Sequence, residues 1–140
     1  MSRPTLDSYF LQHAQVASMR ATCARRAVGC ILVDKLGHVL STGYNGPASG
    51  KPHCIDTPCG GRYQPSGTSL DLCEAVHAEQ NALLQCRDVM QIATAYCTDS
   101  PCVHCVKLLL NTSCQRIVFR RLYPHSESER LWDRKWEQQL

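Results

Sequence analysis

Two short stretches decide how this chain folds: His77-Ala78-Glu79 and, further along, Pro101-Cys102-Val103-His104-Cys105. His77, Cys102 and Cys105 supply one imidazole and two thiols, a three-ligand set for zinc that leaves a fourth tetrahedral position open for water. Glu79 lies two residues after the histidine. This is so close along the backbone that we do not expect Glu79 to be a fourth zinc ligand. The stretches therefore predict a catalytic zinc site, with Glu79 as the residue that moves protons at the open position.

A structural zinc site is the alternative interpretation of the same residues. Such a site needs a fourth protein ligand, and Glu79 would then be an ordinary carboxylate on a helix surface.

Length and composition favour an intracellular domain. The 140 residues suit a single domain covering 1–140, and we find no apolar run long enough to span a membrane. The first residues lack the apolar segment and cleavage site of a signal peptide, so we expect a cytoplasmic location and ten reduced cysteines. Disulfides would require secretion. Reduced cysteines at this density favour metal binding.

The charge of the chain argues against a polymer as partner. Its formal charge is +3, from 15 basic and 12 acidic residues. Apart from Arg25-Arg26 and Arg120-Arg121, the basic residues are scattered. This is a weak footprint for duplex nucleic acid, but it is compatible with a small anionic substrate.

Periodicity predicts helices and strands in alternation. Apolar residues recur at three- and four-residue spacing over residues 5–20, which indicates a helix with one buried face. Short apolar and β-branched runs indicate strands over residues 27–34, 38–43, 92–98 and 116–121. Further helices are expected over residues 74–87, from Pro101 to residue 110, and from Ser126, the last with Leu131, Trp132 and Trp136 on its apolar side.

This order of elements predicts an α/β fold. After the first hairpin, strands and helices alternate, which implies parallel neighbours joined by right-handed crossovers. We therefore expect a mixed central sheet with helices on both faces.

A second metal site is expected around residues 48–71. This stretch has little periodicity and many glycines and prolines, and so long a loop in a compact domain is usually functional or pinned. Its own cysteines and two others predict a structural zinc site with four thiolates, in which His53 could replace one: Cys23, Cys54, Cys59 and Cys73. The alternative is four thiols without a metal.

Five stretches match the pattern of one enzyme superfamily. They are Thr22-Cys23-Ala24-Arg25-Arg26-Ala27-Val28-Gly29, Gly43-Tyr44-Asn45-Gly46-Pro47, Pro52-His53-Cys54, His77-Ala78-Glu79-Gln80-Asn81-Ala82, and Pro101-Cys102 with Cys105. The chain resembles the zinc-dependent cytidine and deoxycytidylate deaminases, whose known signature is histidine-x-glutamate followed by proline-cysteine-x-x-cysteine. The glycine-tyrosine-asparagine-glycine turn and the proline-histidine-cysteine step point to the deoxycytidylate (dCMP) deaminase branch.

The resemblance implies a three-layer α/β/α cytidine-deaminase-like fold and hydrolysis of dCMP to dUMP for thymidylate synthesis. It also implies a homo-oligomer, a hexamer or smaller, and many members respond to the effectors dCTP and dTTP. If the chain is encoded by a phage, the location would be the host cytoplasm. Some members hold a second zinc through cysteines that match Cys23 and Cys54.

Substrate contacts can also be assigned. By resemblance, Asn45 would hold the sugar 3′-hydroxyl, although local sequence alone favours a plain Asn-Gly turn there. Arg25 or Arg26 would hold the 5′-phosphate, for which a guanidinium has suitable geometry. Candidates for the remaining contacts are the backbone N–H of Ala78 and a backbone group near Ser100, which would read the base, and Tyr123, which would line the pocket.

Two other functions fit the zinc motif. A nucleic-acid deaminase would use the same chemistry on a flipped cytosine or adenine, but the modest charge and the absence of a basic-aromatic stripe count against it. A non-catalytic, zinc-stabilised assembly module is the second. Turnover of free dCMP discriminates among the three.

Overall fold

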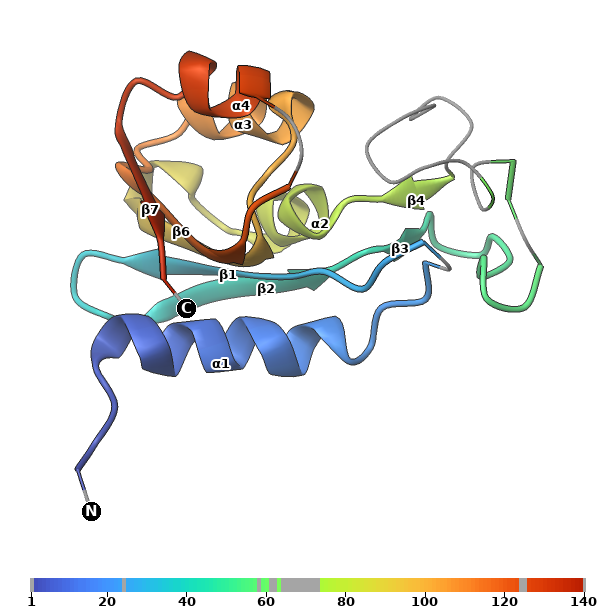
Figure 1. Ribbon diagram of the computed structural model, residues 1–140, viewed down its shortest axis with the longest axis horizontal. Helices are drawn as coiled ribbons and strands as arrows, with labels where there is room; N and C mark the ends of the chain where they lie inside the picture. The colour runs from blue at the N-terminus through green and yellow to red at the C-terminus, as the bar shows by residue number, and fades with distance from the viewer. Residues whose placement is uncertain are drawn as a thin grey trace.

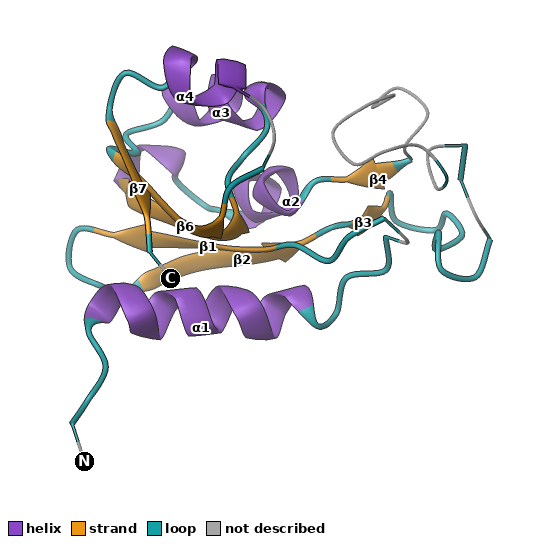
Figure 2. Cartoon of the chain, in the orientation of Figure 1, coloured by secondary structure: helices purple, strands orange, loops and turns teal. Residues whose placement is uncertain are grey.

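The computed structural model describes residues 2–23, 25–57, 59–60, 63, 74–123 and 126–139. A five-stranded sheet with the order β2-β1-β5-β6-β7 forms its centre. Helix α1 (Leu6–Ser18) covers one face, and the opposite face carries the other three helices (Figures 1 and 2), which are α2 (Ala78–Gln85), α3 (Val103–Leu110) and α4 (Ser126–Leu131). The expected mixed sheet between helices is confirmed.

The strands pair in both directions. Strand β1 (Gly29–Asp34) forms an antiparallel hairpin with β2 (Val39–Tyr44) and is also antiparallel to β5 (Ile92–Asp99). Strand β5 is parallel to β6 (Arg116–Arg121), which is parallel to β7 (Lys135–Gln138). At the hairpin, Gly37 has a φ of 83°, a conformation that costs glycine little.

Alternate residues of β1 serve the two faces of the sheet. Ile31 and Val33 pack against α1 in one apolar cluster. Cys30 and Leu32 belong to the larger cluster, which includes side chains of α2 and α3. This is the period of two that a strand buried on both faces requires.

Helix α2 lies very close to the sheet because β2 contains Gly43. A Cβ atom at this position would overlap the backbone of Ala78 and Ala82. Only glycine permits this approach, and it places the beginning of α2 directly on the sheet.

The C-terminal part differs from the prediction. We expected Trp136 on the last helix, but α4 ends at Leu131 and Trp136 lies on β7, paired with Ile117. The Trp132 indole N–H donates to the Lys135 carbonyl (2.9 Å) in the turn between them. A strand satisfies the backbone groups at the outer edge of β6, which a longer helix would leave unpaired.

The helices near the metal ligands begin later than expected. Residues 75–76 form a short strand, β4 (Ala75–Val76), paired with β3 (Gly46–Pro47). Helix α2 therefore starts at Ala78, and His77 is its N-cap. Helix α3 starts at Val103, with Cys102 as the N-cap. His77 and Cys102 both have the extended backbone that is typical of an N-cap residue.

Among the described residues, no helix combines the length and the apolar character needed to cross a lipid bilayer.

Candidate active site

Three donor atoms converge between the beginnings of α2 and α3. His77 Nδ1 lies 3.4 Å from the Sγ atoms of both Cys102 and Cys105, and the two sulfurs are 3.7 Å apart. A tetrahedral zinc bonded at about 2.3 Å to sulfur and about 2.0–2.1 Å to nitrogen would hold two sulfurs about 3.8 Å apart and sulfur and nitrogen about 3.5 Å apart. The spacing fits one zinc ion.

Local structure explains why these donors meet. The backbone N–H of His77 donates to Gln80 Oε1 (2.9 Å), and the His77 carbonyl accepts from Asn81 N (2.9 Å). The Cys102 carbonyl likewise accepts from Val106 N (3.0 Å). Two helix N-termini thus face the same point, and their positive ends favour thiolates there.

The electrostatics of the group suit a metal. Hydrogen bonding from Cys105 lowers the pKa of Cys102 to about 3, against the effect of burial and with help from His77. The same thiol–thiolate contact and burial raise the pKa of Cys105. Hydrogen bonding to Cys102 raises the pKa of His77. One thiolate is therefore already favoured, and thiolates are the form in which cysteine binds zinc.

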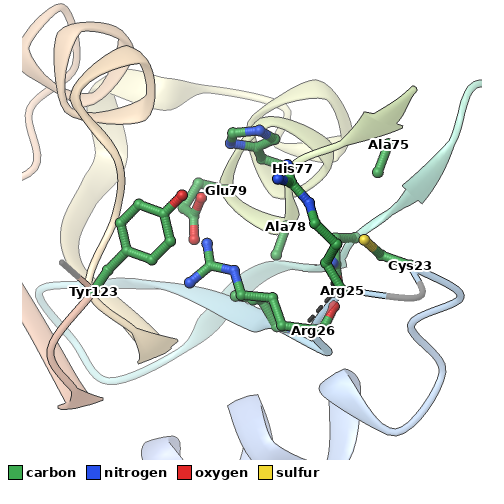
Figure 3. A pocket seen from close by; sticks show the side chains of 10 residues that line it. Cys23, Arg25, Arg26, Ala75, His77, Ala78, Glu79 and Tyr123 are labelled. Carbon is green, nitrogen blue, oxygen red and sulfur yellow. Dashed lines mark hydrogen bonds between the residues drawn. The ribbon is translucent and has the colours of Figure 1, made fainter. Parts of the chain in front are cut away.

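Glu79 lies beside the metal group without being part of it. In the described part of the chain, the ligand atoms that gather within 4.8 Å of one another belong to His77, Cys102 and Cys105. Glu79 is 4% exposed. Burial raises the pKa of its carboxyl, which a hydrogen bond from Cys105 partly offsets. Figure 3 shows its side chain directed into the pocket from α2.

Most of the predicted contact residues line one pocket (Figure 3). The lining consists of Cys23, Arg25, Arg26, Val28, Asn45, Ala75, His77, Ala78, Glu79 and Tyr123. Ser100 is not in this lining: its hydroxyl accepts from Tyr123 N (2.7 Å), and its own N–H donates to the Arg121 carbonyl (2.9 Å). It therefore supports the wall of the pocket from behind.

Asn45 holds the segment that leads into β1. Its Oδ1 accepts from Val28 N (2.9 Å), and its Nδ2 donates to the Arg26 carbonyl (2.7 Å). β2 ends at Tyr44 and β3 begins at Gly46, so the chain continues from one strand to the next and does not form the plain Asn-Gly turn. The buried amide connects β2 to the arginine-bearing segment instead.

One residue of this region was missed in the sequence. Asp99, the last residue of β5, accepts from Arg26 Nη1 through Oδ2 (3.0 Å) and from Arg121 Nη2 through Oδ1 (2.9 Å). The signal that could have found it is an acidic residue that ends a strand just before the Pro101-Cys102 motif.

The residues expected at a second zinc are only partly described. Cys54 and Cys59 lie with their sulfurs 3.5 Å apart, and His53 Nδ1 is 2.7 Å from Thr22 Oγ1. Cys23 lines the pocket described above. Cys73 lies outside the described residues.

This architecture is that of a zinc-dependent deaminase domain: a sheet carries two helices that present one histidine and two cysteines beside a buried glutamate. The sequence profile of the cytidine and deoxycytidylate deaminase zinc-binding region matches residues 4–121. The chain therefore belongs to this family.

Similar proteins carry related names. The chain is 36% identical to deoxycytidylate deaminase of Saccharomyces cerevisiae over 91% of its own length, but it spans only 41% of that relative. It is 40% identical to deoxycytidylate deaminase of Mycobacterium phage D29, over 85% of this chain and 97% of the phage protein. A structure of dCMP deaminase from cyanophage S-TIM5 with dCMP and dUMP shares the fold, with a TM-score of 0.77, 22% identity, and coverage of 99% of this chain and 100% of that chain.

Proposed function

We propose that the protein is a dCMP deaminase, which hydrolyses dCMP to dUMP and ammonia in pyrimidine nucleotide biosynthesis. The observation that carries the proposal is one pocket in which a buried carboxylate, Glu79, lies beside a metal-binding histidine and faces two arginines. The names of the yeast and phage relatives support dCMP as the substrate.

A zinc ion held by His77, Cys102 and Cys105 would supply a water activated near neutral pH and a polarising charge. Glu79 acts as the proton carrier. It accepts a proton from the water as the oxygen attacks C4 of cytosine, and it passes that proton to N3. It then takes the remaining proton from the new C4 hydroxyl and delivers it to the amino group, so that the C4–N bond breaks and ammonia leaves. One carboxylate can serve both steps because both atoms of a cytosine bound in this pocket would be within its reach.

Substrate contacts in this proposal follow from the lining. Arg25 or Arg26 binds the 5′-phosphate and Asn45 the 3′-hydroxyl, through its second amide N–H, while Tyr123 lines the wall. The backbone N–H of Ala78 reads the base. Ser100 lies outside the lining, and its N–H already donates to the Arg121 carbonyl. In this proposal its carbonyl would accept from the cytosine amine at the edge of the pocket.

A second, structural zinc belongs to the proposal, with Cys54 and Cys59 supported by the short distance between their sulfurs. The remaining ligands would come from Cys23, Cys73 and His53. By family resemblance we also propose a homo-oligomer, a hexamer or smaller, regulation by dCTP and dTTP, and a location in the cytoplasm, or the host cytoplasm for a phage protein.

The test is ammonia release measured with five substrates: dCMP, CMP, dCTP, deoxycytidine and single-stranded DNA. The proposal expects dCMP to have the highest kcat/KM. Faster turnover of single-stranded DNA would identify a nucleic-acid deaminase instead, and turnover of none of them by the zinc-loaded protein would favour the assembly module.

A further inference from the structure

We infer that Asp99 is a positioning residue that holds Arg26 in the pocket and Arg121 beside it, and that it thereby sets the preference for a substrate with a single phosphate group. The inference deepens the proposed dCMP deaminase function and rests on it.

Asp99 contacts the two guanidinium groups through different carboxylate oxygens. Oδ2 accepts from Arg26 Nη1 (3.0 Å), whereas Oδ1 accepts from Nε (3.0 Å) and Nη2 (2.9 Å) of Arg121. The side chain of Asp99 is 13% exposed. Both contacts can therefore exist together, and little water competes for the carboxylate.

The secondary structure keeps this arrangement in place. Asp99 and Arg121 are the last residues of the parallel strands β5 and β6, and they are partners in the strand register. The hydrogen bond from Ser100 N to the Arg121 carbonyl continues that pairing. Asp99 is thus held at the carboxyl edge of the sheet, beside the pocket.

Arg26 is held from three directions. Asp99 binds its guanidinium, and Asn45 Nδ2 donates to its backbone carbonyl. The guanidinium carbon Cζ also lies over the ring of Tyr123, 3.8 Å from the ring centroid. Figure 3 shows the guanidinium extending into the pocket beside Tyr123 and Glu79. A side chain fixed before the ligand arrives loses less conformational entropy on binding.

The charge balance points to a monophosphate. The two guanidinium groups on one carboxylate leave a formal charge of +1. This charge attracts a phosphate group without creating a strongly positive site. Asp99 supplies the negative charge that keeps the pocket from becoming a stronger site for a triphosphate.

The central experiment replaces Asp99→Asn, which keeps the size but removes the charge that binds both arginines. We expect kcat/KM for dCMP to fall about tenfold, mostly through KM, because a charge-assisted contact to phosphate is weakened. Turnover of deoxycytidine, which has no phosphate, should stay within about twofold, and the ratio of dCTP to dCMP turnover should rise. Asp99→Glu restores the charge and should bring the ratio of dCTP to dCMP turnover part of the way back to its value in the unmodified protein.

Asp7→Asn is the matched control. Asp7 is also a partly buried carboxylate that binds an arginine, Arg116, but at the opposite end of β6. Its loss should leave the ratio of dCMP to deoxycytidine turnover unchanged. If Asp99→Asn lowers the turnover of dCMP and deoxycytidine equally, so that their ratio is unchanged, Asp99 is only structural and the inference is overturned.

A double-mutant cycle tests the route of the effect. If Asp99 acts through Arg26, Asp99→Asn should have little further effect on the ratio of dCMP to deoxycytidine turnover in a protein that already carries Arg26→Ala. Full additivity contradicts this route. If Asp99→Asn does not fold, Arg121→Gln serves instead, because that side chain is 62% exposed. We expect it to lower the ratio of dCMP to deoxycytidine turnover. An unchanged ratio would contradict the inference.

Calorimetric binding separates this inference from the proposed reaction. With the zinc-loaded protein, Asp99→Asn should weaken dUMP binding about tenfold and leave deoxyuridine binding unchanged, whether or not dCMP is turned over. If the unmodified protein does not release ammonia from dCMP, the proposed function fails, while the binding comparison still decides the role of Asp99.

Discussion

Glu79 has surroundings that separate proton transfer from metal binding. It is almost fully buried, and it lies outside the group of donor atoms formed by His77, Cys102 and Cys105 in the described residues. A carboxylate in this position can exchange protons with a substrate without being needed to hold the ion.

We therefore expect Glu79→Gln to retain its zinc and to lose turnover by at least about 10²–10⁴-fold, the usual contribution of a positioned general acid-base. Glutamine keeps the size of the side chain but cannot carry a proton. Zinc content and ammonia release should be measured on the same sample, with the exposed Glu129→Gln as control. Loss of zinc together with activity would make Glu79 structural.

At the scale of single elements, the close contact between β2 and α2 positions the site. Gly43 allows the backbone of α2 to lie directly on the strand, and the buried Ser41 hydroxyl donates to the Ala82 carbonyl (2.8 Å). Because His77 and Glu79 begin this helix, any displacement of α2 moves a metal ligand and the proton carrier together.

Gly43→Ala should therefore destabilise the fold by about 1–3 kcal/mol, the usual cost of overpacking a core. We also expect equal losses of kcat on dCMP and deoxycytidine. Thermal unfolding and the two rates provide the measurements. Thr42→Ala, at an exposed position of the same strand, is the control. A stable Gly43→Ala protein with full activity would show that α2 does not depend on this contact.

The segment around Cys54 is a second element with a testable role. Its pair of sulfurs, 3.5 Å apart, motivates the prediction of two zinc ions per chain. Elemental analysis of protein purified without chelator should give two, and Cys54→Ser should give one together with a lower Tm. Cys86→Ser, at a half-buried cysteine, should not change the count. A single zinc ion, with unchanged Tm in Cys54→Ser, would rule out the second site.

At the scale of the whole molecule, Asp7 connects the first helix to the strands of the C-terminal half of the chain. Its carboxylate accepts from the Tyr96 hydroxyl (2.6 Å), from Arg116 Nη2 (3.0 Å) and from Gln139 Nε2 (2.8 Å). These groups belong to β5, β6 and the residue that follows β7. Burial acts to raise the pKa of Asp7, but the three hydrogen bonds outweigh it and lower the pKa below its ordinary value.

Because the folded-state pKa is lowered, Asp7 stabilises the protein above its unfolded pKa, and this contribution disappears as the pH falls through the folded pKa. At neutral pH, Asp7→Asn should cost about 1 kcal/mol, a modest value because the group is partly exposed. The difference in free energy of unfolding from the unmodified protein should begin to shrink near the ordinary pKa of aspartate, about 4, and should vanish only when the pH falls below the lowered folded-state pKa. Asp133→Asn, 81% exposed, is the control. A difference that persists unchanged into acid would contradict this role.

The sequence alone determined the local parts of this protein. Residue spacing identified the metal ligands, because His77, Cys102 and Cys105 lie at or near helix starts whose signals are local. Apolar runs identified the strands at residues 29–34, 92–99 and 116–121 to within a few positions, because the part of a strand that is buried on both faces is mostly apolar.

Only the tertiary structure decided the rest. The segment containing Trp136 could fit a helix or a strand, and it became β7 because the edge of β6 supplies backbone partners. Asp99 meets Arg121 through the register of β5 and β6, and it meets Arg26 because the buried amide of Asn45 holds the segment before β1. Such pairs join residues far apart in the chain, and their contacts depend on strand register and on packing between layers. Local patterns do not encode either of these.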